Sequence, residues 1–105
     1  MVLEPSFYIL AAVTRSPLHG YAILRAVNEL SEGRVKLRAG TLYAALDRLV
    51  RESALIVDSE TIVDGRLRRN YRITTFGRQL LRASAERFEA NAAVAWTQLA
   101  GPVKS

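Results

Sequence analysis

The chain has no cysteine and only one histidine, His19, among its 105 residues. The absence of cysteine excludes a disulfide scaffold, a thiol nucleophile and a thiolate metal site. A zinc site needs about four nitrogen, sulfur or oxygen ligands, so one histidine provides almost no material for a metal centre. Ser16 and Ser53 have no paired histidine, and we therefore predict no catalytic residue, no metal ion and no cofactor.

Long hydrophobic runs are also missing. The longest, Phe7 to Val13, has seven residues, whereas a helix needs roughly 20 to span a bilayer. Residues 1–5 lack the basic start of a signal peptide. We therefore expect a cytoplasmic protein that has no membrane partner.

The composition is that of one globular domain, with 50% hydrophobic and 24% charged residues. The formal net charge is +5, and residues 34–72 carry nine basic and five acidic side chains. Thirteen of the 15 cations are arginine, whose planar guanidinium suits phosphates and guanine edges. Such a basic segment indicates nucleic-acid binding only when it lies within a fold that is known to bind nucleic acids.

Hydrophobic periodicity predicts three helices, a hairpin and a fourth helix. The helices are expected at 5–14, 18–30, 40–52 and 75–99, the strands at 55–57 and 67–74, and residues 34–39 form either a strand or an extended connection. Asp64-Gly65 is a favoured hairpin turn. This order predicts a mainly α fold with a two-stranded β-hairpin. We interpret it as a winged helix-turn-helix (1–74) plus a C-terminal dimerisation helix (75–100), in one continuous fold unit. The third helix of such a fold enters the major groove of DNA.

The last predicted helix carries apolar residues at heptad spacing for nearly three heptads. These residues are Leu81, Ala85, Phe88, Ala92, Ala95 and Leu99. A chain of this size has a marginal core by itself. We therefore expect a homodimer in which this stripe is buried against its counterpart and against the partner's first helix, at Phe7.

Four segments at 9–13, 18–23, 40–49 and 71–77 carry a family likeness over almost the whole chain. The most specific are Gly40-Thr41-Leu42-Tyr43 and Tyr71-Arg72-Ile73-Thr74. Together they resemble the PadR family of bacterial transcriptional regulators, which implies a dimeric winged helix that binds DNA. Ala39 and Ala44 stand where that family usually has proline, and Ser53-Ala54 stands where it has glycine. Because of the second departure, the sequence does not determine the conformation of the turn before the wing.

The start of the third helix is the first candidate DNA contact. A helix N-terminus attracts phosphate through its free N–H groups and partial positive charge, and the hydroxyls of Thr41 and Tyr43 can add donors. The resemblance places both residues on the DNA face, and we include Ala44 with them. The alternative is that Thr41 caps the helix and Tyr43 packs.

Arginines supply the other candidate DNA contacts. We expect Arg38 to touch the DNA backbone and Arg48 to bind guanine or phosphate. Asp47 would be repelled by phosphates, so we expect it to pair with Arg51 at i+4. The wing contributes a cluster beside its turn, whose alternative role is to protect an edge strand: Arg66, Arg68 and Arg69.

Two aromatic positions have both a structural and a functional interpretation. His19 and Tyr21 are expected to be structural, with Gly20 permitting close approach of helices. Trp96, the sole tryptophan, either anchors the dimer core or forms an aromatic wall of an effector pocket at the dimer interface. The resemblance allows the second role.

Three functions are compatible with these patterns. The first is a homodimeric regulator, acting as a repressor, that binds an inverted-repeat operator on double-stranded DNA and is released by a small aromatic effector. The second is a winged helix that serves protein interaction or assembly without sequence-specific DNA binding. The third is a ligand sensor whose DNA affinity is weak or lost.

Overall fold

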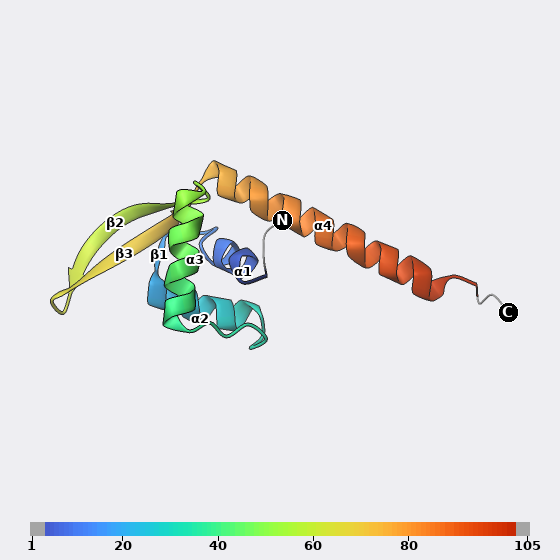
Figure 1. Ribbon diagram of the computed structural model, residues 1–105, viewed down its shortest axis with the longest axis horizontal. Coiled ribbons are helices and arrows are strands. Elements are labelled where there is room, and N and C mark those ends of the chain that lie inside the picture. Colours follow the sequence, from blue (N-terminus) through green and yellow to red (C-terminus); the bar gives the residue numbers. More distant parts are fainter. Residues whose placement is uncertain (1–3, 103–105) are drawn as a thin grey trace.

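The computed structural model describes residues 4–102 (Figure 1). Within that range the elements are, in chain order, α1 (Glu4–Ala12), β1 (Leu18–His19), α2 (Gly20–Leu30), α3 (Ala39–Arg51), β2 (Leu55–Val63), β3 (Arg66–Ile73) and α4 (Thr75–Ala100). We call residues 4–74 the head, α4 the arm, and the β2–β3 hairpin the wing. The four predicted helices all form. Residues 35–38 form no regular element, so the alternative of a strand there is wrong.

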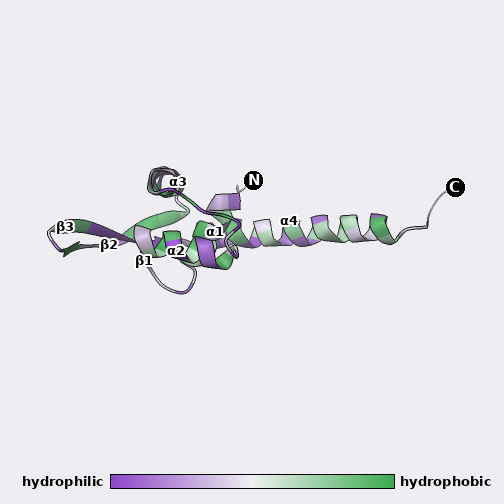
Figure 2. Cartoon of the chain, turned by 90° about the horizontal axis from the view of Figure 1, so that it is seen from below, coloured by the Kyte–Doolittle hydropathy of each residue, from purple (hydrophilic) through white to green (hydrophobic). Residues whose placement is uncertain are grey.

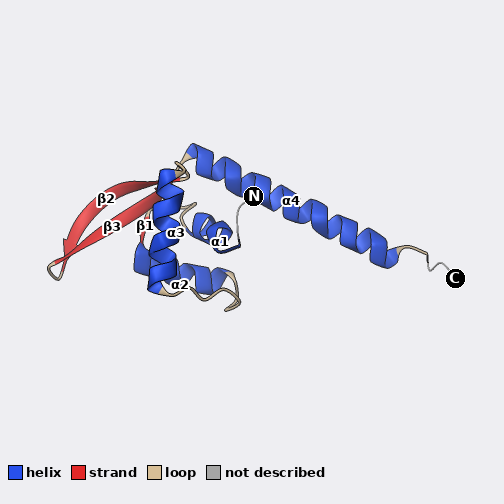
Figure 3. Ribbon diagram, in the orientation of Figure 1, coloured by secondary structure: helices blue, strands red, loops and turns tan. Residues whose placement is uncertain are grey.

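The sheet is antiparallel, and its order is β1-β3-β2 (Figure 3). The predicted hairpin forms between β2 and β3, but the sheet has one strand more than predicted, because Leu18 and His19 pair with β3. Two residues are too few to show an alternating pattern, and the helix expected from residue 18 begins at Gly20 instead. The strand β2 is longer than expected, whereas β3 has the expected eight residues, shifted by one position. The two strands meet at the predicted turn, where Asp64 and Gly65 both have positive φ.

The core of the head lies where the three helices meet the inner end of the wing. The predicted apolar face of α3 is buried at Leu42, Ala45, Leu46 and Leu49. It packs against aliphatic residues of α1 and α2 and against the first residue of β2 and the last residues of β3. These are Ile9, Leu10, Val13, Ile23, Val27, Leu55, Tyr71 and Ile73. The opposite face of α3 is left toward solvent.

The turn between α3 and the wing is made without glycine. Ser53 has a φ of 64°, the left-handed conformation in which helices commonly end. Its N–H donates to the Val50 carbonyl at 3.0 Å, and the Ala54 N–H donates to the Leu49 carbonyl at 2.9 Å. This pair of hydrogen bonds is a Schellman motif, so the turn is retained at the cost of a strained serine.

A corner joins the end of α3 to the start of α4. The Thr74 hydroxyl donates to the Ser53 carbonyl at 2.6 Å and accepts the Gly77 N–H at 2.9 Å, which caps the arm. A methyl group on Gly77 would overlap the Ala54 carbonyl oxygen. Arg78 donates to the Thr14 carbonyl at 2.6 Å. These contacts set the direction in which the arm leaves the head.

Because the arm extends away from the head, the chain is not compact. The principal extents are 69 × 27 × 21 Å and the radius of gyration is 16.9 Å, whereas a compact domain of this length has about 13 Å. Figure 2 shows hydrophobic residues along α4 out to its far end. Val94, Trp96 and Leu99 are 63–76% exposed there. The head cannot cover this surface.

We predict that Ser53→Gly stabilises the protein by about 1 kcal/mol, because glycine adopts positive φ without the steric cost that serine carries. Urea unfolding at a fixed protein concentration measures the change. Glu52→Gly is the matched control, since Glu52 has a φ of −82°, and it should be neutral or destabilising. Equal effects of the two substitutions would contradict the assignment of strain to Ser53.

Candidate nucleic-acid interface

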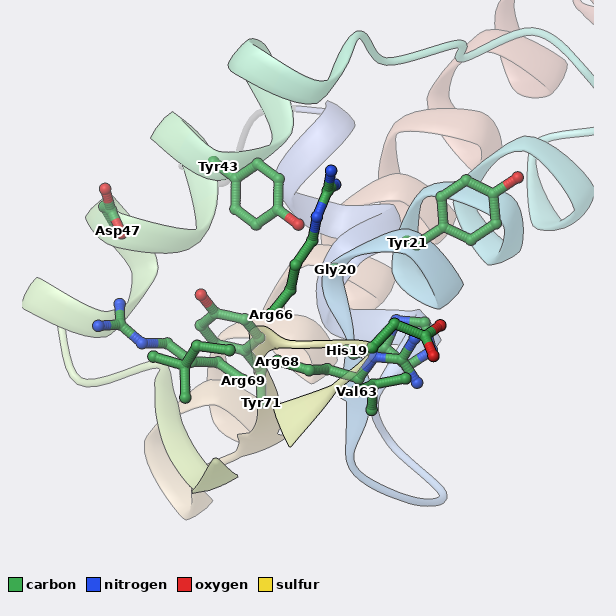
Figure 4. Close-up of a pocket in the computed structure, with 12 residues that line it drawn as sticks. His19, Gly20, Tyr21, Tyr43, Asp47, Val63, Arg66, Arg68, Arg69 and Tyr71 are labelled. Carbon is green, nitrogen blue, oxygen red and sulfur yellow. The ribbon is translucent and has the colours of Figure 1, made fainter. Parts of the chain in front are cut away.

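A groove of about 810 Å³ runs between the wing, α3 and the start of α2. Its lining includes Tyr21 and Tyr43 from the two helices and Arg66 and Arg68 from β3. Figure 4 shows these side chains gathered from the three elements, with the Arg66 side chain extending toward the gap between the two tyrosines in that view. The groove therefore combines aromatic rings, hydroxyls and guanidinium groups on one side of the head.

The first turn of α3 faces solvent with its backbone donors uncapped. Arg38 is the N-cap residue, and no side chain among residues 4–102 hydrogen-bonds to this end of the helix. Thr41 lies inside the helix, so the alternative in which Thr41 caps it is wrong. Thr41 and Ala44 are exposed, as is Arg38. This end of α3 can thus present N–H groups and a hydroxyl to an anion.

Tyr43 both packs and faces solvent. Its ring lies so close to Gly20 that a Cβ there would be 2.6 Å from the tyrosine Oη, which confirms the expected close approach of helices at Gly20. Tyr43 is nevertheless 48% exposed. The two interpretations of Tyr43 are therefore compatible: α2 positions the ring, and the hydroxyl stays in the groove.

Arg48 points away from the groove. Its Nη2 donates to the Ser6 Oγ of α1 at 2.6 Å, and Ser6 is 2% exposed. The expectation that Arg48 binds DNA is thus not supported by its conformation, in which the guanidinium joins α3 to α1. The cause is position: Arg48 lies at the edge of the buried face of α3, next to Leu49.

Asp47 lines the groove and does not form the expected pair with Arg51. Within residues 4–102 the ion pairs are Arg69–Glu60, at 3.2 Å, and Arg72–Asp58, at 2.9 Å. Asp47 therefore leaves one uncompensated negative charge on the α3 side of the groove.

The three wing arginines divide between the two faces of the hairpin. Arg69 lies on the face of Tyr71 and is paired with Glu60, whereas Arg66 and Arg68 lie on the other face and have no ion pair in the described part of the chain. Burial raises the pKa of the Tyr71 phenol, an effect that nearby Arg69 opposes. Arg66 and Arg68 are thus the wing cations available to a ligand.

His19 and Tyr21 line the groove as well, although the sequence predicts a structural role for them. The His19 Nδ1 accepts the Ala22 N–H at 3.3 Å and caps α2, so the structural role is real. Burial lowers the pKa of His19, and Arg68 and Arg25 lower it further, which favours the neutral ring that can accept this bond. Tyr21 is 62% exposed with the Arg25 guanidinium 5.6 Å from its ring centre. Both residues belong to the Leu18–Ile23 segment, one of the four that carry the family likeness, and this is the sequence signal that could have identified them as groove residues.

The predicted dimerisation residues fall into two groups along the arm. Leu81 packs against the core of the same chain, and Phe88 meets the Phe7 ring of the same chain at 5.1 Å between centroids. Ala85 is half-buried. The outer part of the stripe is exposed along its length, together with Trp96: Ala92, Ala95 and Leu99. Of the predicted stripe, this outer part and one side of Phe88 are exposed in the described chain.

No helix in residues 4–102 has the length and apolar character needed to cross a membrane. A model of the transcriptional regulator PadR-like family matches residues 9–83. The chain belongs to the PadR-like family. The family is described as one of transcriptional regulators.

The chain is similar to one curated protein in sequence and to several solved structures in fold. Transcriptional regulator Rv3488 of Mycobacterium tuberculosis is 38% identical over 74 residues, which cover 70% of this chain and 65% of that relative. A PadR family regulator from Clostridium difficile superposes with a TM-score of 0.77 at 19% identity, covering 92% and 99% of the two chains. PadR of Bacillus subtilis, in complex with operator DNA, has a TM-score of 0.68 at 22% identity, covering 76% and 45%. At these identities the two structures show a common winged-helix fold.

The Arg48–Ser6 contact should stabilise this PadR-like head. We predict that Ser6→Ala lowers the free energy of unfolding by about 1.5 kcal/mol, because a hydrogen bond to a charged group is lost from a buried site. A double-mutant cycle with Arg48→Ala should give a coupling energy of about 1 kcal/mol or more. Arg51→Ala, at an exposed position on the same helix, is the control and should change stability by less than about 0.5 kcal/mol. Additive single effects would show that the contact is absent in solution.

Proposed function

We propose that the chain is a homodimeric repressor that binds an inverted-repeat operator with the start of α3 in the major groove. The observation that carries this proposal is the groove between α3 and the wing, which opens beside an uncapped helix end. The DNA bases and backbone would be contacted by Thr41, Tyr43 and Ala44, and a phosphate group would be bound by Arg38. The Bacillus subtilis relative, whose structure contains operator DNA, supports this use of the fold.

The wing would hold the backbone beside the recognition helix. Arg66 and Arg68 provide the cations for this, while Arg69 is engaged with Glu60 and contributes less than its charge suggests. Each phosphate that is neutralised should add about 0.9 to the slope of log K against log salt. Arg48 contributes by fixing α3 on α1 and not by touching DNA.

The uncovered arm supports the proposal of a dimer. Leu99 is 76% and Trp96 69% exposed in the single chain, and a second arm would cover this stripe. Pairing the arms would place two recognition helices about one turn of DNA apart, roughly 34 Å. Such a dimer, acting in the cytoplasm, would block transcription by occupying a promoter. A small aromatic effector that stacks on Trp96 would alter the arms and so release the DNA.

Selection of bound fragments from random DNA tests the function directly. We expect an inverted repeat with half-sites about one turn apart, bound in the presence of excess nonspecific DNA. Binding without any preferred sequence would instead favour a winged helix that serves protein interaction.

Tyr43 should contribute to operator affinity through its hydroxyl and through its position. We predict that Tyr43→Ala weakens operator binding by about 1–3 kcal/mol. Gly20→Ala should weaken it as well, because the added methyl group displaces the Tyr43 ring. The two changes should not be additive, since both act on one side chain. Fluorescence anisotropy with labelled operator measures all three variants.

Tyr43→Phe is the matched control, because it keeps the ring on Gly20 and removes only the hydroxyl. Unchanged affinity in both Tyr43→Ala and Gly20→Ala would show that α3 docks in another orientation.

The outer arm should be needed for dimerisation. We predict that the double variant Ala95→Glu with Leu99→Glu is a monomer whose operator affinity falls roughly 100-fold or more, because two linked heads bind with avidity. Thr97→Glu is the control, since Thr97 is exposed and lies about 160° around the helix from both Ala95 and Leu99 at 3.6 residues per turn. Sedimentation equilibrium gives the mass. A double variant that stays dimeric would place the interface elsewhere.

A further inference from the structure

The tip of the wing carries two aliphatic side chains that nothing in the described chain covers. Ile62 is 76% and Leu67 58% exposed, and the two residues are direct cross-strand partners. A cross-strand pair of this kind helps the hairpin form. That role does not explain why a hairpin tip should present two large aliphatic groups to water, where polar β-formers such as threonine also pair well.

A β-bulge determines which way this pair faces. The register of β2 shifts between Val57 and Ser59, so one extra residue enters that strand. Beyond the shift, Ile62 joins Leu67 on the face that bears Val57 and the buried Tyr71 closer to the head. In an unbulged strand Ile62 would lie on the opposite face. The irregularity therefore brings the two exposed aliphatic groups together on the inner face of the sheet.

The surroundings of the pair indicate what covers it. Leu67 lines the groove beside α3 together with its sequence neighbours Arg66 and Arg68. The nearby acids are Asp64, at the turn, Glu60, which Arg69 neutralises, and Asp47, which lines the α3 side of the same groove. The apolar pair leaves one face of the hairpin tip, and the side chains of Arg66 and Arg68 leave the other face. A tip with this arrangement fits a narrow surface of apolar walls flanked by negative charge. A DNA minor groove, lined by sugars between two rows of phosphates, has this character, and a neutral protein surface does not.

We propose that Ile62 and Leu67 form a wedge that enters the minor groove beside the half-site read by α3. The inference rests on the proposed function and adds a determinant of specificity to it. At about 3.3 Å per residue, Leu67 lies roughly 20 Å along the strand from Ile73 in the core, so the pair reaches beyond the α3 contacts. Apolar wedges of this kind insert at base steps and open the minor groove.

The wedge predicts selectivity against an amino group in the minor groove. A guanine N2 amino group projects there, whereas an A·T pair has none. Flexible pyrimidine–purine steps, which open at low cost, should be favoured under the wing. The major-groove contacts of α3 would not register either feature, so the two kinds of readout can be separated.

The test replaces adenine by 2,6-diaminopurine at the base pairs under the wing, which adds the minor-groove amino group and leaves the major-groove edge unchanged. For the natural chain we expect affinity to fall about tenfold on the modified operator. The double variant Ile62→Thr with Leu67→Thr should bind the unmodified operator about tenfold more weakly and lose sensitivity to the modification. Its salt dependence should be unchanged, because Arg66 and Arg68 remain.

Two controls separate the wedge from hairpin stability. Ile56→Thr, at an exposed position on the opposite face of the wing, should keep the sensitivity to diaminopurine. Ile62→Val with Leu67→Val keeps the tip apolar and should keep most of the affinity and the selectivity. Circular dichroism confirms that each variant folds.

The outcomes that overturn the inference are distinct. If the threonine variant binds both operators like the natural chain, or if the natural chain ignores the modification, the wedge is wrong and the proposed function stands. If the threonine variant changes only the oligomeric state, the pair contacts a second copy of the chain. If the natural chain selects no operator at all, the proposed function fails and the wedge fails with it.

Discussion

The corner between α3 and α4 is the contact on which the rest of the structure depends. Three groups meet there: the serine carbonyl that ends α3, the threonine hydroxyl that starts α4, and a glycine with no room for a side chain. Because the Thr74 hydroxyl bonds to both Ser53 and Gly77, the end of the recognition helix and the start of the arm are fixed to each other. A rotation of one must be transmitted to the other.

The corner matters because it sets the direction of the arm, whose outer half is exposed. The head has its own core, but it covers only the first half of α4, through Leu81 and the Phe7–Phe88 contact. The remaining apolar surface has no cover within the described chain. A second copy would bury it, and the corner would then orient both heads relative to one dimer axis. A ligand that moved the arms would therefore move the recognition helices.

The sequence predicted the architecture well because its strongest signals are periodic. The buried face of α3 and the heptad stripe of α4 follow directly from spacing, and the Asp64-Gly65 pair is a strong turn signal because both residues tolerate positive φ. The signals that failed are local or conformational. A two-residue strand such as β1 has no period, and the bulge at Asp58 makes the face of Ile62 unpredictable from alternation.

Side-chain direction was the other limit. Arg48 is next to residues that face the groove, yet it turns to Ser6, 42 positions away in the chain, and no sequence rule identifies that partner. Arg69 belongs to an arginine cluster, but Glu60 on the opposite strand neutralises it. Tyr43 could be assigned to packing or to the DNA face, and its ring does the first while its exposure permits the second.

The spacing of the two recognition helices is the most direct measure of this account. The chain has no cysteine, so Asp47→Cys on α3 introduces one spin-label site per subunit. Double electron–electron resonance should give one narrow distribution near 34 Å, the separation of successive major grooves on one side of DNA. An absence of dipolar coupling, or a broad spread of distances, would contradict a corner that orients two heads on a paired arm.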